Sequence, residues 1–170
     1  MPLARLIAVA LVCLAADGCF QSTEEFIPAA EAEFPFESIT YRTTDDDRSY
    51  SLIRDGDSYR PESEDTTLRL KKLADDTWLV QTAFVDDGKT LYLYGVAVLD
   101  AGGKAFRVYK AIAEAGDRTP AVLARYGLAA CDGEPDNICL SSADTYLAYV
   151  KDRIAAGDAP STTFEILERK

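Results

Sequence analysis

The fold is decided by residues 77–99, which read TWLVQTAFVDDGKTLYLYGVAVL. Two apolar runs flank the polar sequence Asp86-Asp87-Gly88-Lys89, which is typical of a tight turn between antiparallel strands. Alternate residues of a strand point to opposite faces. In the first run, Trp78, Val80 and Phe84 share one face, and Leu79, Gln81, Ala83 and Val85 share the other. In the second run, Leu91, Leu93, Ala97 and Leu99 alternate with Tyr92, Tyr94, Val96 and Val98. Both faces are largely apolar, so both need cover.

Similar runs, separated by polar turns rich in Asp and Gly, extend on both sides of this hairpin. The predicted strands are Ser38–Thr44, Ser49–Arg54, Thr66–Leu73, Thr77–Val85, Thr90–Leu99 and Ala105–Ala111. A parallel crossover needs a dozen or more residues, so these short connections predict antiparallel pairing. The last apolar run, Phe164–Leu167, is expected to add an edge strand.

Two helices are predicted near the C-terminus. Thr119 as an N-cap, Pro120 at the first helical position and Gly127 after the end delimit a short helix. The pattern Ser141-x-x-Asp144 opens a longer helix, which carries Leu147, Val150 and Ile154 on one stripe and stops at Gly157. We therefore predict an α+β fold: a single antiparallel β-meander of six to seven strands, packed with the two C-terminal helices. The helices would cover one face of the central strands, and curvature of the sheet could cover the other.

The N-terminal residues 1–18 have the pattern of an export signal. Arg5 precedes an uncharged run that ends at Ala16, and the small residues Ala16 and Gly18 stand three and one positions before Cys19. The uncharged run is shorter than the ~20 apolar residues that a membrane-spanning helix needs. Residues 19–36 contain a Ser-Thr-Glu-Glu run, two prolines and Ala-Glu repeats, which predicts a tether, and residues 37–170 then form a single globular domain.

The sequence Leu14-Ala15-Ala16-Asp17-Gly18-Cys19 resembles the lipobox of bacterial lipoproteins. The resemblance implies that the signal is cut before Cys19, that Cys19 receives a diacylglyceryl group and that its new amine is acylated. The only membrane contact would then be this lipid anchor. Ordinary signal cleavage at the same bond remains an alternative. Phe20 is not the aspartate that favours inner-membrane retention in similar enterobacterial lipoproteins. In a Gram-negative source we therefore expect the cell envelope, at the outer membrane facing the periplasm.

Removing the leader leaves three cysteines, Cys19, Cys131 and Cys139. Lipidation of Cys19 would account for the odd number of cysteines. Cys131 and Cys139 would then remain as a disulfide pair in an oxidising compartment. The chain has no histidine and no second cysteine pair, so a zinc site would lack ligands.

The absence of histidine also excludes Ser-His-Asp and Cys-His catalysis, and no phosphate-binding or dinucleotide-binding motif is present, so no cofactor is predicted. The net charge of −11 argues against nucleic acid as a partner. Clustered acidic turns leave two alternatives, a secreted calcium-binding protein and a hydrolase that uses two carboxylates. The acidic side chains expected at one end of a meander are Asp45, Asp46, Asp47, Glu62, Glu64, Asp65, Asp86 and Asp87. None of these segments has EF-hand spacing.

Aromatic residues suggest a different role. Tyr92, Tyr94 and Tyr109 fall on strand positions that could form one lateral patch for a protein, peptide or glycan partner. The competing interpretation is that the helices cover this face and that the tyrosines belong to the core. The sequence thus favours a non-enzymatic cell-envelope lipoprotein, a binding or structural module anchored through Cys19.

Overall fold

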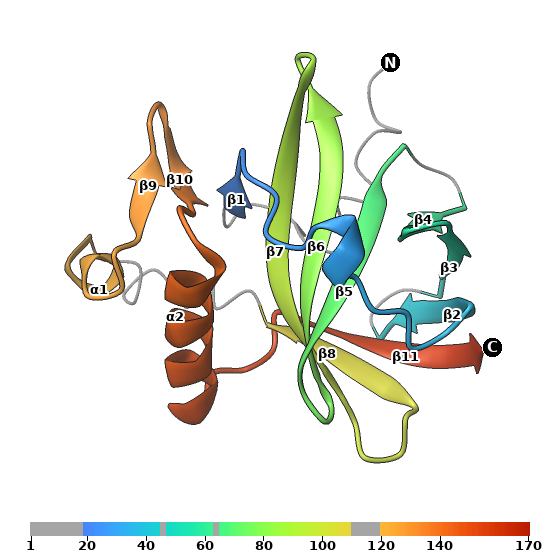
Figure 1. Ribbon diagram of the computed structural model, residues 1–170. Helices are drawn as coiled ribbons and strands as arrows, with labels where there is room; N and C mark the ends of the chain where they lie inside the picture. Colours follow the sequence, from blue (N-terminus) through green and yellow to red (C-terminus); the bar gives the residue numbers. More distant parts are fainter. Residues whose placement is uncertain (1–18, 45–46, 63–64, 110–119) are drawn as a thin grey trace.

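The computed structural model describes residues 19–44, 47–62, 65–109 and 120–170, and most of these residues lie in β-strands (Figure 1). The strands are β1 (Phe20–Ser22), β2 (Ser38–Thr43), β3 (Ser49–Asp55), β4 (Ser58–Pro61), β5 (Thr67–Ala74), β6 (Thr77–Asp86), β7 (Lys89–Leu99), β8 (Ala105–Tyr109), β9 (Ala129–Cys131), β10 (Glu134–Cys139) and β11 (Thr162–Arg169). The helical segments are a 3-10 turn, η3 (Ala29–Glu31), and the helices α1 (Pro120–Ala124) and α2 (Ala143–Ala155).

The sheet closes on itself. Each strand from β2 to β8 pairs with the next, and β11 lies between β8 and β2. Within the described residues these eight strands form a closed antiparallel barrel, outside which β1, β10 and β9 extend the sheet from β7. The predicted α+β meander packed with two helices is therefore wrong. Phe164 does not belong to an edge strand, because it is opposite Phe106 on one side and Thr43 on the other.

The physical reason for closure lies in the central hairpin. Trp78 pairs with Ala97, and Leu79 pairs with Val96. The side chains of residues 77–99 therefore alternate between the two faces of the sheet, as the sequence predicts. A twisted sheet buries its concave apolar face by rolling up around it. The predicted turn also forms: Asp87 and Gly88 both have positive φ, 46° and 76°, as a type I′ hairpin turn requires.

Two separate hydrophobic cores result. The inner core fills part of the barrel and consists of Ile39, Tyr41, Leu52, Tyr59, Leu68, Leu70, Val80, Leu93, Val108 and Phe164. The outer core joins the outside of β6 and β7 to β1, α1, β10 and α2, and consists of Phe20, Ile27, Leu79, Tyr94, Val96, Tyr109, Leu123, Leu128, Ile138, Leu140, Tyr146, Tyr149 and Val150. Figure 1 shows α2 beside the barrel, away from β2 to β5.

The segment predicted to be a tether belongs to the fold. Phe20 and Ile27 are 2% and 0% exposed. Strand β1 pairs antiparallel with β7 and parallel with β10. The composition predicted a spacer because acidic residues and prolines surround these apolar side chains. The segment nevertheless packs into the fold, because burial of its apolar side chains is favourable.

The C-terminal elements differ in detail from their prediction. The side chain of Ser142, and not Ser141, caps α2 by accepting a hydrogen bond from the Thr145 N–H (3.3 Å). Thr119, predicted to cap the first helix, and Ala111, the predicted end of a strand, lie outside the described residues. Among the helices that the structure describes, none combines the length and apolar character needed to cross a membrane.

Candidate functional site: an apolar cavity in the barrel

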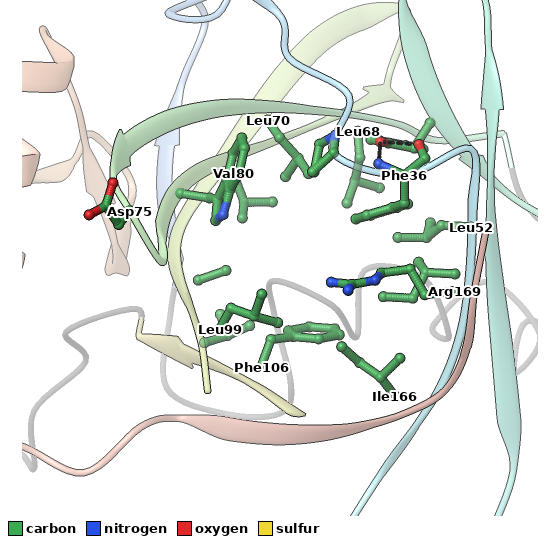
Figure 2. Close-up of a pocket in the computed structure, with 16 residues that line it drawn as sticks. Phe36, Leu52, Leu68, Leu70, Asp75, Val80, Leu99, Phe106, Ile166 and Arg169 are labelled. Atoms are coloured by element: carbon green, nitrogen blue, oxygen red, sulfur yellow. Dashed lines mark hydrogen bonds between the residues drawn. The ribbon is translucent and has the colours of Figure 1, made fainter. Parts of the chain in front are cut away.

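An apolar cavity of about 130 Å³ lies within the barrel (Figure 2). Its wall comes from alternate residues of several strands, including Leu70 of β5, Val80 of β6, Leu99 of β7, Phe106 of β8 and Ile166 of β11. Trp78, which is the only tryptophan of the sequence, also lines it. An eight-stranded barrel is just wide enough to be filled by side chains or to hold one small ligand.

Aromatic side chains fill the interior beyond the cavity. The Tyr41 ring meets the Phe164 ring edge-on at 5.3 Å, and Phe164 stacks on Phe106 at 4.8 Å. Tyr41 and Phe164 are almost completely buried. Of these rings, Phe106 lines the cavity, and the lining residues Asp75 and Leu99 lie at the end of the barrel that carries the β5–β6 and β7–β8 turns.

The segment between η3 and β2 forms part of the rim at that end. The Glu33 N–H donates to the Leu70 carbonyl (2.8 Å), and the Phe36 ring stacks on the Tyr59 ring at 4.6 Å. The Tyr59 hydroxyl donates to the Phe36 carbonyl (2.7 Å). Burial raises the pKa of Tyr59 to about 12, against the opposing effect of this hydrogen bond. The segment covers the seam where the short strand β4 meets β5 through a single residue pair, Tyr59 and Leu68.

Arg169 is the cation of the cavity. Its side chain is exposed at the end of β11, and Figure 2 shows its guanidinium directed toward the middle of the cavity, on the side opposite Val80. A β-bulge between Ile166 and Glu168 sets this direction, because it brings Arg169 opposite the inward-facing Ile39 and Glu168 opposite Thr40. Without the extra residue, Glu168 would be opposite Ile39.

Three other cations near this end are paired with carboxylates. Arg54 contacts Glu37 (3.0 Å), Lys72 lies 4.0 Å from Asp75, and Lys170 lies 2.9 Å from Glu168. Within the described residues the Arg169 guanidinium has neither an ion pair nor a hydrogen bond. Its nearest approach to the β7–β8 turn is at Gly103, where an added Cβ would lie 3.6 Å from a guanidinium nitrogen.

Acidic groups at the rim are already engaged. The Asp100 carboxylate accepts hydrogen bonds from the backbone N–H groups of Lys104 (2.7 Å) and Ala105 (3.0 Å). These bonds hold the pKa of Asp100 below its usual value. Asp75, the other acidic residue beside the cavity, lies nearest Lys72. Among the described residues that line the cavity, Arg169 is the one cation, and it is available to a ligand.

The tyrosines considered for a lateral patch are core residues. Tyr94 and Tyr109 are 0% and 8% exposed, and Tyr92 is half-buried against the outer core. The Tyr94 hydroxyl donates to the Glu24 carbonyl (2.9 Å) and lies 3.1 Å from Gln81 Oε1. Burial raises the pKa of Tyr94. The structure therefore supports the interpretation that this face is covered.

Two of the cysteines, Cys131 and Cys139, lie in the hairpin of β9 and β10. Cys131 and Cys139 form the predicted disulfide, with a Cα–Cα distance of 4.9 Å, and it joins β9 to β10. Cys19 directly precedes β1 and is partly buried against the inner core, and in the full chain its sulfur is also disulfide-bonded. Its backbone N–H donates to Asn137 Oδ1 (2.9 Å), and its carbonyl accepts from the Ile138 N–H (2.8 Å).

The acidic loops give no metal site among the described residues. No group of three or more His, Cys, Asp or Glu side chains there is arranged to hold a metal ion. The connections β2–β3, β4–β5 and β6–β7 do lie at one end of the barrel, but Asp45, Asp46 and Glu64 fall outside the described residues. The calcium and carboxylate-hydrolase alternatives therefore gain no structural support.

Sequence reasoning did not find the cavity. The inward faces of the strands were identified, but an open sheet has no interior, so their side chains could not be assigned to one site. The signal that could have pointed to it is the pair of small residues Gly95 and Ala97, which lie between Leu93 and Leu99 on the inward face of β7. Comparison with protein families, curated proteins and solved structures finds no match for this chain.

Proposed function

We propose that this protein is a non-enzymatic binding module that holds a small apolar molecule inside its barrel. The observation that carries the proposal is the apolar cavity of about 130 Å³, bounded by the β-strands and the rim segment. An engineered apolar cavity of about 150 Å³ stays dry and binds benzene, so a void of this size suits a hydrocarbon group of about six carbon atoms.

The expected affinity follows from the buried area. A hydrocarbon group of this size removes roughly 150–200 Å² of apolar surface from water, which at ~25 cal/mol per Å² is worth about 4–5 kcal/mol. That corresponds to a dissociation constant near the millimolar range for the apolar part alone. Further affinity would have to come from a polar group at the rim.

Trp78 provides a direct test, because the sequence has no other tryptophan and this one lines the cavity. Titration with 1-octanol is expected to change Trp78 fluorescence with saturation. Ala97→Leu would place extra bulk in the cavity beside Trp78 and should abolish the change. Ala130→Leu, on an exposed position of β9, adds the same bulk outside the barrel and should leave it intact.

The outcome is informative in both directions. A saturable response in the wild type and in Ala130→Leu, lost in a folded Ala97→Leu, supports the proposal. If Ala97→Leu does not fold, the smaller change Ala97→Val replaces it and should weaken binding. A non-saturable response, or an equal response in all variants, would refute an internal site.

We also propose, from the leader and its resemblance to a lipobox, that the protein is exported and anchored in the cell envelope through Cys19. An N-acylated Cys19 keeps the N–H that donates to Asn137. Since β1 begins at Phe20, no spacer would separate the anchor from the barrel, and the domain would lie directly against the membrane. The proposed partners are thus the membrane, through the anchor alone, and one apolar small molecule.

Mass spectrometry of the protein from its native envelope tests the anchor. An N-terminus at Cys19 that carries acyl chains, with Cys131 joined to Cys139, is the expected result. Cys19→Ala should move the protein to the soluble fraction without changing 1-octanol binding. An unmodified Cys19 in a soluble wild-type protein would refute the anchor and leave a secreted binding module.

A further inference from the structure

Resting on the proposed function, we propose that the ligand is a single-chain carboxylic acid. Its carboxylate would bind the Arg169 guanidinium, and its hydrocarbon chain would extend between Phe36, Phe106 and Val80. In Figure 2, Phe36 and Phe106 lie on either side of the guanidinium, and Val80 lies beyond its tip. The inference identifies the ligand class of the cavity and the residue that selects it.

The first support is the register of β11. Regular alternation after Phe164 and Ile166 would direct Glu168 inward, and a carboxylate there would repel an acid. The β-bulge exchanges it for Arg169, opposite Ile39. A bulge that redirects a side chain next to a cavity is a common feature of binding sites. The local backbone irregularity therefore has a chemical result, a cation at the cavity in place of an anion.

The second support is the charge balance. The protein carries a net charge of −11, yet the Arg169 guanidinium has no carboxylate partner in the described part of the chain. Its planar fork matches a carboxylate through two parallel N–H donors. Among the described residues, Arg169 is the one cation that lines the cavity, with Asp75 and Asp100 at the same rim, so a monoanion fits better than a phosphate ester of charge near −2.

The third support is size. A void of about 130 Å³ accepts about six carbon atoms, and Figure 2 shows the guanidinium directed toward the middle of the lining side chains. A chain of about six to eight carbons would therefore place its apolar end inside and its carboxylate at Arg169. Longer chains would have to leave methylene groups exposed at the rim.

The test compares three ligands of one chain length, which are sodium octanoate, 1-octanol and octyl phosphate, by Trp78 fluorescence at pH 8 and low salt. Wild-type protein should bind octanoate about tenfold more tightly than 1-octanol, and octyl phosphate less tightly than octanoate. Arg169→Gln should remove the preference for octanoate over 1-octanol, because it lowers octanoate affinity much more than 1-octanol affinity. Lys170→Gln removes a neighbouring cation that does not line the cavity and should change neither.

Each result bears on one of the two proposals. If 1-octanol binds but octanoate shows no preference, or if Arg169→Gln weakens both ligands equally, the carboxylate site is refuted and the apolar cavity stands. Tighter binding of octyl phosphate would overturn the choice of a carboxylic acid. If neither octanoate nor 1-octanol binds with saturation, the proposed function fails with it.

Discussion

The inner and outer cores lie on opposite faces of the same two strands, β6 and β7, but they are filled to different degrees. In the outer core, Tyr94, Tyr146 and Tyr149 are completely buried, and Phe20 contacts Tyr146 and Tyr149 at ring distances of 5.0 and 5.7 Å. The Tyr146 hydroxyl donates to the Tyr94 carbonyl (3.2 Å). In the inner core, similar numbers of large side chains leave a cavity of about 130 Å³.

The difference shows that the interior of the closed barrel is packed less completely than the core outside it. Strand β1, helix α2 and the β9–β10 hairpin are separate elements that can each settle against the barrel wall until the gap is filled. The barrel has no such freedom, because strand number and stagger fix its radius. Where inward side chains are too small for that radius, as at Ala97, a void persists.

Matched leucine-to-alanine variants should reveal this contrast as the largest effect. Leu79 lies in the outer core and Leu70 in the cavity wall. We expect Leu79→Ala to lower the free energy of unfolding by about 4 kcal/mol, and Leu70→Ala by about 2.5 kcal/mol. Leu70 already lacks neighbours on its cavity side, so its removal loses fewer contacts. Urea denaturation measures both. Equal losses would mean that the two cores are equally packed.

The disulfide tests how independent the outer core is. Cys131→Ala with Cys139→Ala opens a loop of sequence separation 8, and the chain-entropy estimate for such a loop is about 2.5 kcal/mol. Among the described strands, β10 pairs with β1 and β9 and not with a barrel strand, so the loss should be confined to β9, β10 and α1. Hydrogen exchange should accelerate there first, and 1-octanol binding should persist. Loss of that binding would show that the outer core supports the cavity.

A feature of the fold could be predicted from the sequence where it depends on residues that are close together in the chain. The alternation of Leu79 and Val80, the Asp87-Gly88 turn and most strand bounds are local features, and they were predicted. Closure was not, because it depends on Phe164 pairing with both Phe106 and Thr43, far apart in the chain. Nothing in the residues of an edge strand differs from those of a closing strand.

The candidate site was missed for a related reason. Arg169 points into the cavity only because of a bulge, and a bulge of one residue leaves no mark on the composition of β11. The apparent tether was misread because its apolar residues, Phe20 and the pair Phe26-Ile27 among them, follow no periodic pattern. Their partners, Tyr146 and Gln81 among them, come from distant strands and helices.

Alkaline pH should distinguish the cores through their tyrosines. Burial raises the pKa of Tyr59 at the cavity rim to about 12, whereas an unfolded tyrosine titrates near 10. The unfolded chain therefore releases this proton first, so stability is retained below about pH 10 and falls by about 2 kcal/mol as the pH rises to 12. Burial also raises the pKa of Tyr146 in the outer core. Tyr59→Phe should therefore flatten the fall in unfolding free energy over this range without abolishing it. An unchanged slope would mean that the Tyr59 hydroxyl is already in contact with water.

The smallest expected effect concerns a polar atom on the inner face. The Thr82 hydroxyl is fully buried, between Leu68 and Leu93 on the neighbouring strands, and no described residue forms a hydrogen bond with it. Thr82→Val removes the unpaired hydroxyl and keeps the shape, so it should raise the free energy of unfolding by up to about 1 kcal/mol. Thr82→Ser keeps the hydroxyl and loses a methyl group, so it should lower stability. If Thr82→Val instead destabilises the protein, or weakens 1-octanol binding, the hydroxyl has a partner inside the barrel. The space next to the cavity would then be polar and hydrated.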